Sequence, residues 1–205
     1  MKNREYNKDF KTVIFDYDGT MFDTDAMQQY VGNTKKYPRF SPQWVAARKE
    51  YISHIVDVKP YDGWAEVFKF LRDNNIKAAI VSGNNREVLN LAVKTFGLRD
   101  IFPKEKVNCI GCRDVNGRRI RKSGGNPTLF EFALQQLEET VDNVLAFGNE
   151  PCDALAASSI GITAYNCLWG ATDEDIEVMQ NDHEHVCLSE PREIIEILKS
   201  TYSPS

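Results

Sequence analysis

The chain has 205 residues, of which 42% are hydrophobic and 27% charged, a composition typical of one α/β domain with a modest insertion. Its formal net charge of -5 argues against a general nucleic-acid-binding protein, because such proteins carry an excess of basic residues. No segment approaches the ~18 apolar residues that span a bilayer, and the polar start MKNREYNKDFK lacks a signal-peptide pattern. We therefore expect a cytoplasmic protein with no membrane or nucleic-acid partner.

The first half of the chain alternates short apolar runs with segments of helical periodicity. TVIF at 12–15 predicts a buried strand, and the long stretch that follows it looks helical in two pieces separated by YPRFSP. The elements predicted here are, in chain order, a strand at 12–15, helices at about 24–31 and 42–56, a helix at 63–74, a strand at 77–82 and a helix at 86–96.

The second half repeats this alternation. Asn116-Gly117 is a strong hairpin-turn signal, and Pro127 opens a helical pattern. The elements predicted here are a helix at 127–137, strands at 143–148 and 161–166, a weaker strand at 185–188, and a helix at 191–198. Strands that alternate with helices predict a parallel sheet covered on both faces, with ligands bound beyond the carboxyl ends of the strands.

The five cysteines are an odd number and fit a reducing compartment better than a disulfide framework. Cys109 and Cys112 form a single C-x-x-C, whereas a zinc site would need a second pair or a histidine nearer than His183 and His185. A redox pair would open a helix, but this pair ends a short apolar run. We interpret it as two ordinary buried thiols, with metal or redox chemistry as the alternative.

Two acids follow the first predicted strand, Asp16 and Asp18 in the run DYDGT. On its own this run could be a solvated loop in which Asp and Gly serve turn chemistry. Successive side chains of an extended segment alternate, so Asp16 and Asp18 start on the same face, and Gly19 helps the chain to turn after them.

Other strand ends carry complementary groups. Ser82-Gly83 offers a hydroxyl and a flexible residue before a helix N-terminus, which suits an anion, although an ordinary helix start would look the same. Lys122 could aim an ammonium group at the same place or be one more solvated base. Gly148 to Asp153 adds polar and acidic groups after another strand. Together these residues gather carboxylates, a hydroxyl and a lysine at one edge of a sheet.

The run VIFDYDGTMFDTD resembles the first motif of the haloacid dehalogenase-like superfamily, and Ser82, Lys122 and the segment 148–153 resemble its second, third and fourth motifs. Pro127, Leu129 and Trp169-Gly170 are similar to the phosphoglycolate phosphatase-like branch. The resemblance spans essentially the whole chain. It implies a three-layer Rossmann-like fold with a core domain of residues 1–22 and 60–205 and a small helical cap of residues 23–59.

The resemblance also implies a reaction: magnesium-dependent hydrolysis of the phosphomonoester of a small metabolite through an aspartyl-phosphate. Asp16 would be the nucleophile, and Asp18 would protonate the leaving group and later activate water. The implied ligand sets are Gly19, Ser82, Gly83 and Lys122 for the phosphate, and Asp16, the Asp18 backbone carbonyl and Asn149 for Mg²⁺, with Glu150 or Asp153 as a further metal ligand.

One position departs from the family pattern G-D-x-x-x-D, because Asn149 replaces the first Asp of the fourth motif. Its amide oxygen can still coordinate magnesium but carries no charge, so we expect weaker metal binding. A catalytically weakened binding protein and a phosphomutase therefore stay open as alternatives. A C–halogen substrate is not expected, because the dehalogenase branch typically lacks the acid present here as Asp18.

The expected cap could contact the leaving group of the substrate. Its bases could meet an anion and its aromatic residues a ring, but we favour a solvated charged face and rings packed within the cap. His54 is expected to be a packed or surface residue. The bases are Lys35, Lys36, Arg39, Arg48 and Lys49, and the aromatic residues are Tyr30, Tyr37, Phe40 and Trp44.

Overall fold

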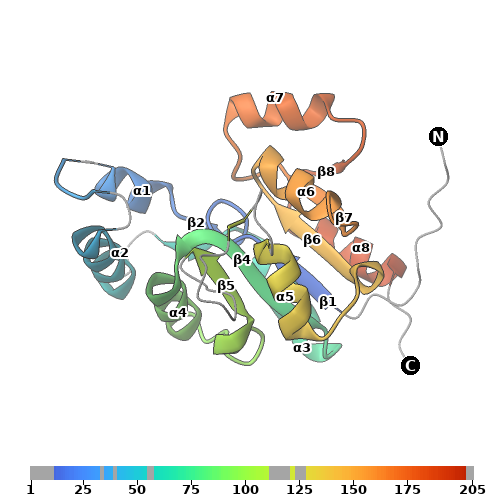
Figure 1. Ribbon diagram of the computed structural model, residues 1–205, viewed down its shortest axis with the longest axis horizontal. Coiled ribbons are helices and arrows are strands. Elements are labelled where there is room, and N and C mark those ends of the chain that lie inside the picture. Colours follow the sequence, from blue (N-terminus) through green and yellow to red (C-terminus); the bar gives the residue numbers. More distant parts are fainter. Residues whose placement is uncertain are drawn as a thin grey trace.

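The computed structural model describes residues 12–32, 35–38, 41–54, 58–110, 121–122 and 128–201. Within these residues a six-stranded sheet forms the centre, and its neighbouring strands are parallel (Figure 1). In spatial order the strands are β5 (Val107–Ile110), β4 (Lys77–Asn85), β1 (Thr12–Phe15), β6 (Val144–Gly148), β7 (Thr163–Cys167) and β8 (Val186–Leu188). The predicted α/β fold class is confirmed.

Strand β1 lies at the centre of the sheet. Its four side chains are at most 1% exposed, as a strand covered by helices on both faces requires. It pairs with β4 on one side and β6 on the other, so that Phe15 is in register with Ile80 and Phe147. Because the three strands are parallel and in register, the residues that follow them meet at one edge of the sheet.

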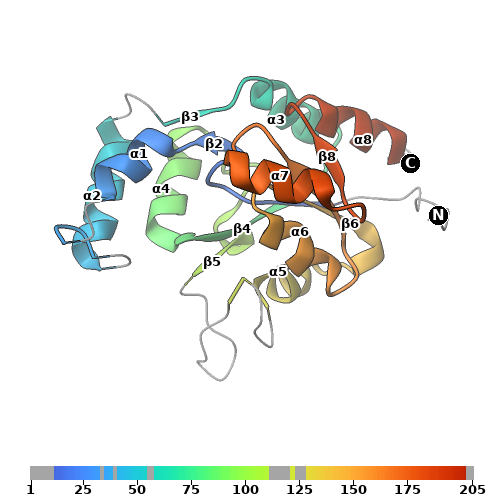
Figure 2. The same cartoon turned by 90° about the horizontal axis from the view of Figure 1, so that it is seen from above.

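Helices cover both faces of the sheet (Figure 2). Helices α3 and α8 lie on one face, and α5 and α6 lie on the other. The helices of this core are α3 (Trp64–Asp73), α4 (Arg86–Thr95), α5 (Leu129–Leu137), α6 (Pro151–Ser158), α7 (Asp173–Asn181) and α8 (Glu193–Thr201), with short 3-10 helices at Lys104–Lys106 and Val141–Asn143. No helix in the described part of the chain is both long and apolar enough to cross a membrane.

Side-chain caps explain where several of these helices begin. Helix α5 begins at Leu129 because Thr128 accepts a hydrogen bond from the Glu131 backbone, while the Glu131 side chain accepts one from the Thr128 backbone. Asn85 accepts a hydrogen bond from the Glu87 backbone at the start of α4. These caps place the starts of both helices within two residues of the predicted ones.

The insertion after β1 holds two helices, α1 (Asp25–Val31) and α2 (Pro42–His54). They lie between two short antiparallel strands, β2 (Phe22–Asp23) and β3 (Lys59–Pro60), and α2 packs beside α4 (Figure 1). Lys49 of α2 forms an ion pair with Glu87 of α4, at 2.9 Å. The boundaries of a core at 1–22 and 60–205 and a cap at 23–59 stay a prediction.

Some expectations fall outside what the structure describes. The Cys112 half of the C-x-x-C pair, the predicted turn at 114–119, Arg39 and Phe40 lie outside the described residues. The same holds for the side chains of His54 and Cys109.

Candidate active site

Asp16 lies directly after β1, where its backbone N–H donates to the Phe147 carbonyl at 2.9 Å and extends the β1–β6 register. Its side chain is buried, and Lys122 Nζ lies 2.8 Å from Asp16 Oδ1. The same ammonium group lies 2.6 Å from Asp153 Oδ1 at the start of α6. The fold thus brings together three candidate residues that are far apart in the sequence.

Among the described residues, Lys122 supplies the one ammonium group in contact with two buried carboxyl groups, those of Asp16 and Asp153, and this arrangement shifts the pKa values of the site. Burial raises the pKa of Asp16 to about 8; Lys122 opposes this rise, and the negative charge of Asp153 adds to it. Burial alone would lower the pKa of Lys122, but attraction by Asp153 and Asp16 holds it well above its ordinary value. The centre thus holds two carboxyl groups beside one ammonium group, and a bound cation would favour the ionised form of Asp16.

Asp153 is engaged at both of its oxygens. Oδ1 faces Lys122, and Oδ2 accepts a hydrogen bond of 3.3 Å from the Glu150 backbone N–H. These contacts let Asp153 hold Lys122 in place, and its expected part as a metal ligand stays a prediction.

Asp18 is held by three described side chains. Arg48 Nη2 donates to Asp18 Oδ1 at 2.8 Å, and Gln28 Nε2 donates to the same oxygen at 3.3 Å. Asn84 Nδ2 donates to Asp18 Oδ2 at 2.8 Å from the end of β4. Two of these donors belong to α1 and α2, so the insertion reaches the candidate general acid directly.

Arg48 is an exception to the expectation that most of the charges of the insertion form a solvated face. Lys35 and Lys36 are exposed, as expected, but Arg48 is only 1% exposed. Its guanidinium lies 4.6 Å from the ring centre of Trp44, which itself packs against Val31. The signal available in the sequence was the spacing of Trp44 and Arg48, four residues apart on one helix face.

The amide of Asn149 ties two loops together. Thr20 Oγ1 donates to Asn149 Oδ1 at 2.8 Å, and Asn149 Nδ2 donates to the Gly170 carbonyl at 2.9 Å. Because a carbonyl oxygen only accepts hydrogen bonds, the amide nitrogen must face Gly170, and Oδ1 keeps a second lone pair. Gly19 has a φ of +76°, and a Cβ there would overlap the Asn149 amide. This network fixes the loop that carries Asp16 and Asp18.

Two indoles reinforce the same loop. The Thr20 carbonyl accepts a hydrogen bond from Trp64 Nε1 at 2.8 Å and another from Trp169 Nε1 at 2.7 Å. The loop is therefore anchored from α3 and from the segment after β7. Sequence reasoning did not identify Thr20, Gln28 or Asn84 as members of the site.

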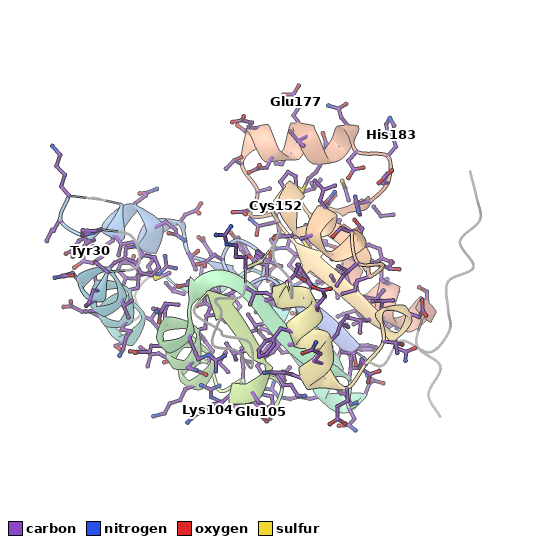
Figure 3. All side chains as sticks on the ribbon, viewed as in Figure 1. Tyr30, Lys104, Glu105, Cys152, Glu177 and His183 are labelled. Carbon is purple, nitrogen blue, oxygen red and sulfur yellow. The ribbon has the colours of Figure 1, made fainter. Side chains whose placement is uncertain are left out.

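A cavity of about 510 Å³ opens above these residues, between the sheet edge and the helices of the insertion. Of the nine candidate site residues, all except Asp153 line it. Ser82 and Gly83 lie on the sheet side of the cavity, and the buried Ser82 hydroxyl accepts a hydrogen bond of 3.1 Å from the Asn84 backbone. Tyr30 lies on α1 away from the sheet and is 47% exposed (Figure 3).

A family model for haloacid dehalogenase-like hydrolases matches residues 33–161, more than half of the chain. The chain belongs to this family. Pyrophosphatase PpaX of Halalkalibacterium halodurans is 24% identical over 213 residues, covering 89% of this chain and 94% of the relative.

Solved structures of this family share the fold. A hydrolase of the family from Deinococcus radiodurans, solved with bound phosphate and sodium, superposes with a TM-score of 0.64 at 19% identity, covering 97% of this chain and 100% of that one. A protein from Haemophilus somnus, described as a "predicted phosphoglycolate phosphatase", superposes with a TM-score of 0.68 at 14% identity. The match covers 92% of this chain and 97% of that one.

Hydrolases of this family generally use a divalent metal ion, and the chemistry of the donors in this chain fits one. The candidate ligands are the Asp16 carboxylate, the Asp18 backbone carbonyl and Asn149 Oδ1, all of them oxygen donors of the kind that hard cations prefer. Asp16 and Asp153 share one ammonium group, that of Lys122, and a cation bound beside Asp16 would favour its ionised form.

Proposed function

We propose that this hydrolase is a magnesium-dependent phosphatase of the cytoplasm that cleaves the phosphomonoester of a small metabolite through an aspartyl-phosphate on Asp16. The observation that carries the proposal is the placement of Asp16, which is buried beyond the central strand, held by Lys122 at 2.8 Å and open to a cavity of about 510 Å³. Its relative named pyrophosphatase PpaX and its structural neighbours support phosphate chemistry of this kind.

The residues divide the reaction between them. A carboxylate oxygen of Asp16 attacks phosphorus, and the bond from phosphorus to the leaving oxygen breaks. Asp18 gives its proton to that oxygen. In the second half Asp18 takes a proton from the water that attacks phosphorus, and the bond from phosphorus to the Asp16 oxygen breaks, which releases phosphate. Lys122, the Ser82 hydroxyl and the Gly83 amide hold the phosphoryl oxygens, and Asp153 positions Lys122.

Magnesium would be held by Asp16, the Asp18 carbonyl and Asn149 Oδ1. When bound, it offsets the repulsion between the Asp16 carboxylate and the phosphate dianion. The Thr20 hydroxyl and the Gly170 carbonyl keep Asn149 Oδ1 oriented for this role.

The direct test is phosphate release from 4-nitrophenyl phosphate with magnesium present or chelated. We expect chelation to lower kcat by about 10²-fold or more, because a metal ion supplies several kcal/mol of transition-state stabilisation. Added magnesium should restore the rate. Equal rates with and without chelator would contradict the proposed metal dependence.

A second candidate function, a catalytically weakened binding protein, is favoured by Asn149. Its amide N–H makes a hydrogen bond to Gly170 that an aspartate could not make. The amide is therefore suited to joining two loops as well as to holding a metal ion. Absence of hydrolysis in the wild type, with hydrolysis in Asn149→Asp, would select this second function.

Asn149→Asp should destabilise the metal-free protein. The new carboxylate would face the Gly170 carbonyl, so a buried hydrogen bond is replaced by repulsion, at a cost of about 1–3 kcal/mol. Urea unfolding with magnesium chelated measures this loss. Asn181→Asp is the matched control, because its exposed amide also donates to a backbone carbonyl, at 2.8 Å, and its loss should stay within about 0.5 kcal/mol. Equal losses of stability in the two variants would show that the buried hydrogen bond from Asn149 to Gly170 stabilises the protein no more than an exposed one.

A further inference from the structure

Arg48 is a buried cation on the insertion side of the cavity. Its guanidinium donates through Nη1 to Gln28 Oε1 at 2.9 Å and through Nη2 to Asp18 Oδ1 at 2.8 Å, and it lies against Trp44. Nε is buried and has no hydrogen-bond partner among the described residues. Arg48 lines the cavity, and because Nη1 and Nη2 each carry two N–H groups, each keeps a second N–H that can bind a ligand there.

In the described part of the insertion, the other charged side chain that lines the cavity is that of Asp25. Asp175 lines the cavity from α7, and Lys122 lies at the sheet edge against Asp16. Among the described lining residues, Arg48 is therefore the cation that an anion would meet on this side.

The contact between Arg48 and Asp18 locates Arg48 relative to the substrate. In the proposed function Asp18 gives its proton to the leaving oxygen, so the two must be within hydrogen-bond distance of each other. Arg48 Nη2 is 2.8 Å from Asp18. Atoms attached to the leaving oxygen therefore come within reach of the guanidinium. Its planar array of N–H donors matches the oxygens of a phosphate or a carboxylate.

We infer that Arg48 determines specificity by binding a second anionic group, a phosphate or a carboxylate, carried by the leaving group close to the scissile oxygen. This inference rests on the proposed function and assigns it a substrate class. The preferred substrates are phosphate anhydrides and esters with two neighbouring anions, rather than phosphate esters of neutral alcohols. Trp44 fixes the plane of the guanidinium, and Gln28 fixes its rotation.

The test compares kcat/KM for three substrates in the wild type and in Arg48→Met. 4-Nitrophenyl phosphate has no second anion, inorganic pyrophosphate has a phosphate there, and 2-phosphoglycolate has a carboxylate. We expect the ratio of kcat/KM for the better doubly anionic substrate to that for the aryl ester to fall by about 10²-fold, mainly through KM, because a charge-assisted, bidentate contact is lost. The substrate with the larger fall identifies the second anion as phosphate or carboxylate.

Lys49→Met is the matched control, because it removes one positive charge from the same helix at a residue that pairs with Glu87 instead of lining the cavity. It should change the ratio by less than about threefold, since an exposed charge contributes little. Arg48→Lys keeps the charge but loses the planar fork, and we expect a fall of about tenfold. If Arg48→Met does not fold, the result with Arg48→Lys tests the inference by itself.

Two results would overturn the inference. If the ratio is unchanged in Arg48→Met and Arg48→Lys, which includes an equal fall of kcat/KM for all three substrates, Arg48 has a structural role, while hydrolysis by the wild type upholds the proposed function. A wild type that hydrolyses none of the three substrates would overturn the proposed function, and this inference with it.

Discussion

Asp16→Asn should lower kcat for phosphate release by on the order of 10⁴-fold or more, because loss of a nucleophile removes the covalent route altogether. The amide has the size of the carboxyl group and can still accept a hydrogen bond from Lys122, so the cavity should keep its shape. Steady-state phosphate release measures the loss. In the wild type, acid quenching during turnover should trap phosphate on the protein in a form that alkali releases, and the variant should trap none.

The stability of Asp16→Asn shows whether its loss of activity comes from the missing nucleophile or from misfolding. Burial raises the folded-state pKa of Asp16 to about 8, so ionisation of Asp16 opposes folding above the ordinary Asp value of about 3.9. The variant cannot ionise there, and at pH 8 with magnesium chelated it should be at least as stable as the wild type. Asp25→Asn removes a carboxylate from the cavity rim and should lower kcat by less than about tenfold. Turnover by Asp16→Asn close to that of the wild type would remove Asp16 from the nucleophile's role.

The strands near the sheet centre were predictable because their burial leaves a plain pattern. TVIF is confirmed as β1 without a shift at either end, and the run 143–148 begins one residue later as β6. Strand β5 was not predicted because Asn108 interrupts its short apolar run. Helix α7 was missed for a similar reason, since its first turn is acidic and Met179 is its one buried residue.

Some contacts of the candidate site could be predicted from the sequence, and others could not. Asp16 and Ser82 could be placed together from sequence, because parallel strands bring their carboxyl ends to one edge. The contact of Arg48 with Asp18 could not, because it depends on how α2 packs beside α4 and over the sheet edge. The bridge from Thr20 through Asn149 to Gly170 joins loops far apart in the sequence, and no local pattern marks it.

Lys122→Met should destabilise the protein by about 3–5 kcal/mol near pH 8, the cost of leaving buried charges without their partner. Lys122 Nζ contacts Asp16 and Asp153 at 2.8 and 2.6 Å, and its side chain is only 16% exposed. Without Lys122 the two carboxylates face each other, and the folded-state pKa of Asp16 rises further because the attraction that opposed its rise is lost. The loss should shrink as the pH falls toward the ordinary Asp value, because protonation removes the repulsion. Urea unfolding at pH 5 and pH 8 with magnesium chelated measures both effects.

Two variants show whether the loss arises from the charges. Lys49→Met breaks an ion pair with Glu87 in which the two side chains are 42% and 67% exposed, so it should cost less than about 1 kcal/mol. Adding Asp153→Asn to Lys122→Met removes one of the unpaired carboxylates while the amide oxygen can still accept from the Glu150 backbone. The double variant should therefore recover part of the stability, which is a coupling that simple loss of packing cannot produce. If Asp153→Asn lowers stability by the same amount with and without Lys122, the two residues are independent, and the ion pair between Lys122 and Asp153 does not stabilise the protein.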